Sequence, residues 1–141
     1  MSSSVIRNIV TDKLKDEWTQ TRVVDLENGR NPLGSSMHPW ASVQFLMATE
    51  EQMCLGDIGD RGWREEGEFH LLVAVPTYSG WGTCLTLMDD LRKLFRAWRS
   101  NDITIRKVHP ARPVLDDNQL IGNWFIMAAL TKYYRDFYEV D

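Results

Sequence analysis

The closing strand candidate, Leu120 to Thr131, constrains the fold more than any other segment, because its centre is apolar on both sides. Successive side chains of a strand point to opposite faces of the sheet. A strand that is apolar on both faces therefore needs cover on both. The alternation would place Trp124, Ile126, Ala128 and Leu130 on one face and Phe125, Met127 and Ala129 on the other. We expect helices to cover one face and a loop or another subunit to cover the other.

Helical periodicity occurs in two places. Apolar residues recur at helical spacing from Val5 to Trp18 and predict a helix from Ser4 to Thr19. A second stripe follows Thr83, which is a candidate N-cap, and Ser100-Asn101-Asp102 ends it. This second stripe consists of Cys84, Leu87, Met88, Leu91, Leu94, Phe95 and Trp98.

Two segments alternate in the manner of half-buried strands. In Trp40 to Thr49, one face would carry Ala41, Val43, Phe45 and Met47. In Trp63 to Val75, one face would carry Phe69, Leu71, Val73 and Val75, and the other Glu66, Glu68 and His70. Shorter strand candidates are 21–26, 52–55 and 103–108, and 132–141 would extend the closing strand. Loops or turns are expected at 27–36, 56–62 and 77–82, and the two prolines in 109–113 argue against regular structure there.

The chain of 141 residues suits one domain, residues 1–141. The order of elements predicts an α+β fold, a mainly antiparallel mixed β-sheet with two helices packed on one face. A net charge of −4 argues against a general nucleic-acid binder, which needs a basic surface. We expect no secretory signal and no membrane span, because no apolar run approaches roughly 20 residues. Cys54 and Cys84 are expected to be buried thiols.

No catalytic or metal-binding signature is complete, so we expect no catalytic residue, no metal and no cofactor. The adjacent carboxylate pairs, such as Glu65-Glu66, are expected to be solvated, because neighbouring residues diverge on strands and helices. Ser79 lacks the glycine that a nucleophile elbow requires two positions earlier. Glu68 and His70 would share a strand face, which leaves a small hydrolase-type enzyme as one alternative. A monomeric binding module is another.

Several short motifs together resemble the tail terminator, or tail-completion, proteins of long-tailed bacteriophages. Their order covers the chain from about Val5 to Asp136. The motifs are an opening helix, Glu27-Asn28, Pro39-Trp40, Gln52 to Gly56, Arg61-Gly62-Trp63-Arg64, Glu66 to Phe69, Val75-Pro76, Gly80-Trp81-Gly82, Leu94-Phe95 and Gly122 to Phe125.

This resemblance implies a structural virion protein and not an enzyme. Such a protein forms a ring, usually a hexamer, that caps the tail tube, stops its polymerisation and provides the surface for head-tail joining. The implied partners are further copies of the chain, the tail tube protein and the head-tail connector protein, with no membrane. The implied location is the virion tail, after assembly in the host cytoplasm. DNA could pass through the lumen of the ring.

Apolar surface left by a lone domain usually marks an interface, and we expect edge-to-edge contacts between subunits. The candidate subunit-interface residues are Trp124, Ile126, Tyr133, Tyr134, Phe137 and Trp81. The loops 28–39 and 57–64 are expected to reach towards the tube or lumen, with Asn28, Arg30, Arg61, Trp63 and Arg64 as candidate contacts. Basic residues that include Arg99, Arg106, Lys107 and Arg112 could contact DNA or the neighbouring ring components.

Overall fold

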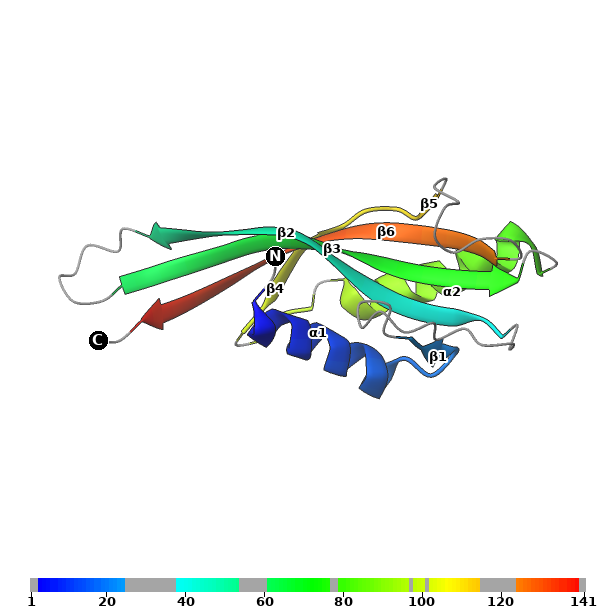
Figure 1. The fold of residues 1–141 in the computed structure, drawn as a ribbon, viewed down its shortest axis with the longest axis horizontal. Helices are drawn as coiled ribbons and strands as arrows, with labels where there is room; N and C mark the ends of the chain where they lie inside the picture. The colour runs from blue at the N-terminus through cyan, green and yellow to red at the C-terminus, as the bar shows by residue number, and fades with distance from the viewer. Residues whose placement is uncertain are drawn as a thin grey trace.

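The computed structural model describes residues 3–24, 38–53, 61–76, 79–96, 98–100, 102–114 and 124–139. These residues form two helices and six strands (Figure 1). In chain order the elements are α1 (Ser4–Glu17), β1 (Arg22–Val23), β2 (Trp40–Met53), β3 (Arg61–Pro76), α2 (Gly80–Phe95), β4 (Thr104–Val108), β5 (Arg112–Pro113) and β6 (Trp124–Glu139).

The described strands form one mixed sheet in the order β1-β2-β3-β6-β4, and β5 also pairs with β6. β1 runs parallel to β2, and all the other pairs are antiparallel. Together with the two helices, this sheet confirms the predicted α+β fold.

Both helices contribute to one apolar cluster on the same side of the sheet. α1 begins after Ser3, whose hydroxyl oxygen accepts a hydrogen bond from the Ile6 amide at 3.4 Å. The helices bury Ile6, Val10 and Leu14 from α1 and Cys84, Met88, Leu91 and Phe95 from α2. These side chains pack with Val43, Phe69, Leu71, Val73, Met127 and Ala129 of the sheet. The amphipathic stripes therefore predicted these buried positions correctly, but Val5, which begins the first stripe, is exposed.

A second, smaller apolar cluster lies on the opposite face of the sheet. It contains Val24, Trp40, Leu72, Ala74, Ile126 and Ala128, with Trp124 partly buried beside them. The rings of Trp40 and Trp124 meet edge to face, with centroids 6.1 Å apart. β6 thus contributes Met127 and Ala129 to one cluster and Ile126 and Ala128 to the other, which confirms that it is apolar on both faces.

A β-bulge in β2 contradicts one predicted strand face. The register of β2 with β3 shifts between Phe45 and Ala48, because β2 has an extra residue there. Met47 is 77% exposed as a result, although simple alternation placed it beside Phe45 in the core. Trp40–Thr49 and 52–55 were also predicted as separate strands, and the structure shows one continuous strand to Met53.

Other boundaries of helices and strands also differ from the predicted ones. Gly80-Trp81-Gly82 is the first turn of α2 and not a separate turn, so Ser79 replaces Thr83 at the N-cap position. Gly80 has φ of 81°, a conformation that glycine adopts readily. The proline-containing segment 109–113 includes β5, which tolerates Pro113 because it pairs with β6 alone in the described sheet. Cys84 is buried as predicted, and Cys54 lies outside the described residues.

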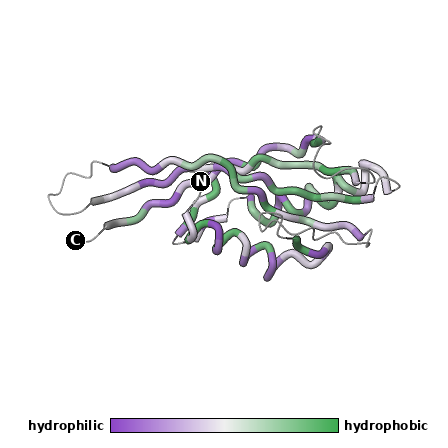
Figure 2. The backbone as a smooth tube through the Cα atoms, in the orientation of Figure 1, coloured by the Kyte–Doolittle hydropathy of each residue, from purple (hydrophilic) through white to green (hydrophobic). Residues whose placement is uncertain are grey.

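The three longest strands project beyond the helices. β2, β3 and β6 continue together past α1 to the end of the molecule that carries the C-terminus (Figure 1). This projecting part is largely hydrophilic, whereas the strands over the helices are largely hydrophobic (Figure 2). We call residues 49–53, 61–66 and 134–139 the arm.

Candidate functional site

The arm is a continuous three-stranded piece of sheet with β3 at its centre. Its register aligns Glu51 with Arg64 and Asp136, and Thr49 with Glu66 and Tyr134. Residues aligned in this way share a face of the sheet. The arm therefore presents rows of charged and aromatic side chains drawn from segments distant in the sequence.

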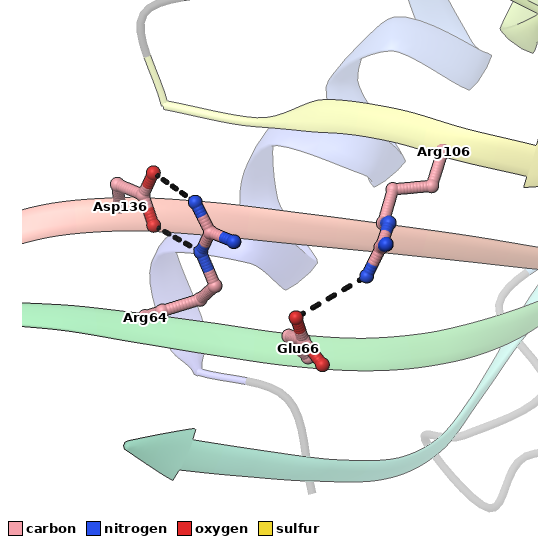
Figure 3. A network of polar contacts seen from close by, with 4 residues as sticks. All are labelled: Arg64, Glu66, Arg106 and Asp136. Carbon is pink, nitrogen blue, oxygen red and sulfur yellow. Dashed lines mark hydrogen bonds and ion pairs between the residues drawn. The ribbon is translucent and has the colours of Figure 1, made fainter. Parts of the chain in front are cut away.

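One face of the arm carries a network of ion pairs (Figure 3). The Arg64 guanidinium donates two hydrogen bonds to Asp136, at 2.7 Å and 2.9 Å. Arg106 of β4 donates to Glu66 at 3.2 Å. Both guanidinium groups also lie over the ring of Tyr134, with the Arg64 and Arg106 guanidinium carbons 4.5 Å and 5.8 Å from its centroid. The network joins β3, β6 and β4 side by side.

Electrostatics favour the charged form of the arm's best-aligned pair. The hydrogen bonds from Arg64 lower the pKa of Asp136. The same bonds raise the pKa of Arg64. Both groups are substantially exposed, so water and salt screen their interaction, and it orders the surface more than it stabilises the fold.

The helix-side face of the arm begins at a buried carboxylate. Glu65 is 1% exposed, so the prediction that the Glu65-Glu66 pair is solvated is wrong for Glu65. Its Oε2 accepts hydrogen bonds from the Tyr133 hydroxyl at 2.7 Å and from the Ser3 amide at 3.1 Å. Its Oε1 has no hydrogen-bond donor among the described residues, and Arg135 Nη1 lies 3.9 Å away. Glu65 thus holds the start of α1 against the sheet.

The predicted subunit-interface residues divide into buried and accessible groups. Tyr133 was predicted to lie at a subunit interface, and the structure corrects this. Its side chain is 1% exposed and packs in the core of the domain, so it is not available to another subunit. Ile126 is also buried, in the second cluster. Trp124 and Tyr134 are half-buried, and Phe137 lies beneath Arg135, whose guanidinium carbon is 4.5 Å from its ring centroid. Trp81 is 65% exposed at the start of α2.

The predicted tube contacts are not all in loops. Arg61, Trp63 and Arg64 belong to β3, so the loop expected at 57–64 is wrong at its C-terminal end. Trp63 is half-buried, and its indole N–H has no acceptor among the described residues. Asn28 and Arg30 lie outside the described residues.

Glu68 and His70 lie on the same face of β3, as predicted. Burial and, secondarily, the charge of Arg112 lower the pKa of His70, and Glu68 opposes this shift. Glu68 lines an open depression of about 640 Å³ whose other charged walls are Glu66, Arg106, Lys107 and Lys132. Within the described ranges, no group of three or more His, Cys, Asp or Glu side chains could hold a metal ion. Cys84 is buried in the core, and burial raises its thiol pKa to about 11.

Sequence reasoning did not find the partners that complete the charged network. Glu66 and Asp136 pair with basic residues 40 and 72 positions away along the chain. The alternation of apolar and basic residues from Ile103 to Val108 was the available signal for Arg106. Its pairing with Glu66 depends on strand order, which the sequence pattern did not specify.

Neither helix of the described part is long and apolar enough to cross a membrane. A scan against protein-family models finds no match, and a search of curated proteins also finds none. Several solved structures match, and one of them is similar over 99% of this chain and 99% of its own length, with a TM-score of 0.52 and 18% sequence identity. At this identity the likeness concerns the fold alone.

Proposed function

We propose that this chain is a structural assembly protein of the tail-terminator type. In this role, copies of the chain form a ring at the end of a phage tail tube, and the family resemblance implies that this ring is a hexamer. The ring stops tube polymerisation and offers a surface for head-tail joining. The protein acts by contact and not by catalysis.

The arm is the observation that carries this proposal. It extends the sheet beyond the two helices and exposes a polar surface on strands that are otherwise part of the core (Figures 1 and 2). A protein that must contact copies of itself needs surface of this kind outside its own core. The family motifs agree with this interpretation, since the resemblance implies a mixed sheet flanked by helices.

The arrangement of accessible aromatic residues also supports an assembly role. Trp81 is exposed on α2, while Tyr134 and Phe137 lie on the arm under arginine side chains. Tryptophan, tyrosine and arginine are the residues that most often dominate the binding energy of protein interfaces. Different patches at separate places suit heterologous contacts, which close into a ring when the rotation allows it.

The direct test is to mix the purified protein with the tail tube of its phage and to image the tubes by negative staining. We expect rings at tube ends and tubes that no longer lengthen when tube protein is added. Tubes that stay bare and continue to grow would contradict the proposal.

Point substitutions are better suited to this assay than truncation after Lys132. Such a truncation removes Tyr133 from the core and would damage the fold itself. Trp81→Ala removes an exposed side chain, so folding should be retained while capping weakens if Trp81 is an anchor. Val5→Ala, on the exposed side of α1, provides a control in which a smaller exposed apolar side chain is shortened.

A further inference from the structure

The two edges of the sheet differ in how far their backbone groups are already paired. β2 pairs with β1 only at Trp40 and Ala41, and with β3 on its other side. From Ala48 through the arm to Met53, no described strand pairs with the outer edge of β2. An edge of this kind presents a row of backbone N–H and C=O groups to solvent or to a partner.

The opposite edge, at β4, is closed by the chain itself. The Ser100 amide donates to the Ile103 carbonyl at 2.8 Å, and the Ile105 amide donates to the Trp98 carbonyl at 2.9 Å. Farther along, the Arg92 guanidinium donates to the His109 carbonyl at 2.8 Å. The β4 edge is therefore blocked against strand addition, and what it offers to a partner is its side chains.

These two edges carry opposite charges. β2 contains Glu50 and Glu51 and no lysine or arginine, and both glutamates are exposed. β4 contains Arg106 and Lys107 and no acidic residue. Arg99, bridged to Thr104, and Arg112 of β5 add two more exposed cations. Within the described residues, Glu50, Glu51, Arg99 and Lys107 make no ion pair, so the described part of the domain does not neutralise these charges.

The position of Lys107 adds to the positive charge of the β4 edge. It lies directly across from Lys132 of β6, and like charges in that position are destabilising. Both lysines are exposed, and Arg106 beside them is already paired with Glu66. Lys107, Arg99 and Arg112 are thus the cations of this edge that remain available to an external carboxylate, and the first two lie on β4 or are bridged to it.

We propose that the β2 edge of one copy receives the β4 edge of a second copy of this chain. Glu50 and Glu51 face Arg99 and Lys107 of the neighbour, whose donors also reach exposed carbonyls of the β2 edge. The domain contains a precedent for this second contact, since Arg92 already caps carbonyl groups at the end of β4. This inference rests on the proposed ring and specifies its subunit contact.

The geometry of the sheet makes this contact head to tail. β2 and β4 lie on opposite sides of the β3-β6 pair in the strand order. Each copy therefore uses a different edge towards each neighbour, and every contact leaves one edge of each kind for the next copy. Such heterologous contacts form a closed ring when the rotation between copies allows it.

A pair of charge-reversed variants tests the contact. The first, E50K/E51K, gives the β2 edge positive charge, and the second, R99E/K107E, gives the β4 edge negative charge. Neither variant removes an ion pair of the described domain. K107E places opposite charges across from each other at Lys132, whereas E51K places like charges across from each other at Arg64, so the folded state of each variant is checked by its unfolding transition. Each variant alone would bring like charges together at every contact. An equimolar mixture restores opposite charges at both kinds of contact between the two variants.

Association is measured by sedimentation at low and high salt, and capping is measured on tail tubes. We expect the association of the wild type to weaken as the salt concentration rises. For each variant alone, we expect the dissociation constant to rise by a factor on the order of ten or more. The mixture should regain assembly with the two variants alternating. D12K/D16K on the exposed side of α1 changes the net charge as E50K/E51K does and should assemble like the wild type.

The outcomes separate this inference from the proposed function. Single variants that assemble and cap tubes like the wild type would overturn the edge contact and leave the terminator role standing. A mixture that assembles while wild-type protein leaves tubes bare would support the edge contact and contradict the terminator role. A wild-type chain that associates neither in solution at high concentration nor on tubes would overturn both.

Discussion

Gly67 allows the closest packing in the centre of the sheet, between β2 and β6. A Cβ atom at this position would lie 2.6 Å from the Tyr133 hydroxyl oxygen and 2.9 Å from the Cβ of Ala48. The tyrosine ring cannot move away easily, because its hydroxyl donates to buried Glu65 at 2.7 Å. Three features therefore depend on one another: the absent side chain at Gly67, the buried ring and the carboxylate that holds the start of α1.

Substitution of Gly67 by alanine should consequently destabilise the protein. The added methyl group either displaces Tyr133 from Glu65 or forces the strands apart, and overpacking of this kind costs about 1–3 kcal/mol. The measurement is urea unfolding of Gly67→Ala beside Gly82→Ala, whose added Cβ would meet nothing within 4 Å. Gly82 lies in α2, so alanine there should be neutral or stabilising by up to about 1 kcal/mol. Equal stability of the two variants would show that Gly67 is not closely packed.

The imidazole of His70 should make stability depend on pH. Burial and Arg112 of β5 lower its pKa in the folded state, Glu68 of its own strand opposes this, and its register neighbours Gln44 and Leu130 are uncharged. The unfolded chain then binds more protons than the folded chain as the pH falls below about 6.5. The stability that neutral His70 contributes is therefore fully present above that pH. It is lost as the pH falls through the lower pKa that His70 has in the folded state.

His70→Gln removes this titration, so the free energy of unfolding should fall less between pH 7.5 and pH 5 in the variant than in the wild type. The two curves are compared by urea unfolding at each pH. Parallel curves would mean that His70 titrates alike in the folded and unfolded chains.

At the scale of elements, α2 stabilises the domain through a narrow buried stripe. Leu91 is fully buried among residues of the main core, while Lys93, two positions later, is exposed. Leu91→Ala should lower the free energy of unfolding by about 2–5 kcal/mol, because it leaves a cavity that the neighbours fill only in part. Lys93→Ala should change it by less than about 0.5 kcal/mol. A loss below about 1 kcal/mol for Leu91→Ala would place α2 outside the core.

Elements whose signal is local were predictable from the sequence. The apolar stripes of α1 and α2 and the alternation in β3 specify which side of each element is buried, and the two-sided apolar pattern of β6 indicated cover on both faces. The β2 bulge was not predictable in this way, because one extra residue reverses the facing of Met47 without any break in β-propensity. The burial of Glu65 was missed for another reason. Its partner Tyr133 is 68 residues away, and only strand order brings the two together.

The same limit applies to the candidate assembly surface. Aromatic residues near the C-terminus suggested an interface, but composition could not separate Tyr133, which points into the core, from Tyr134, which points to the charged face of the arm. The register of β6 with β3, in which Tyr133 lies opposite Gly67 and Tyr134 opposite Glu66, determines which face each tyrosine occupies. That register depends on the assembly of the whole sheet. The opposite charges of the β2 and β4 edges became visible only when the strand order was known.

At the scale of the whole molecule, the arm combines a central strand that is paired on both sides with an outer strand that is paired on one. β3 has β2 and β6 as neighbours along the arm, whereas no described strand covers the outer edge of β2 from Ala48 to Met53. Amide groups that lack a hydrogen-bond acceptor exchange with solvent through small local openings or none. The free chain should therefore show slow exchange along β3 and fast exchange at alternate amides of β2.

Assembly should change this exchange pattern in one place. If the β2 edge receives a neighbouring copy, the contact should exclude water from its outward amides and slow their exchange in the assembled form, without the full protection that strand pairing would give. The amides of buried α2 should be protected in both forms. The comparison is hydrogen exchange followed by mass spectrometry on free and assembled protein, with E50K/E51K as the variant that keeps the fold but loses the contact. Outward amides of β2 that are already protected in the free chain would mean that another part of the same chain covers this edge. In that case the edge would not be available to a partner, and the head-to-tail contact would have to lie elsewhere on the molecule.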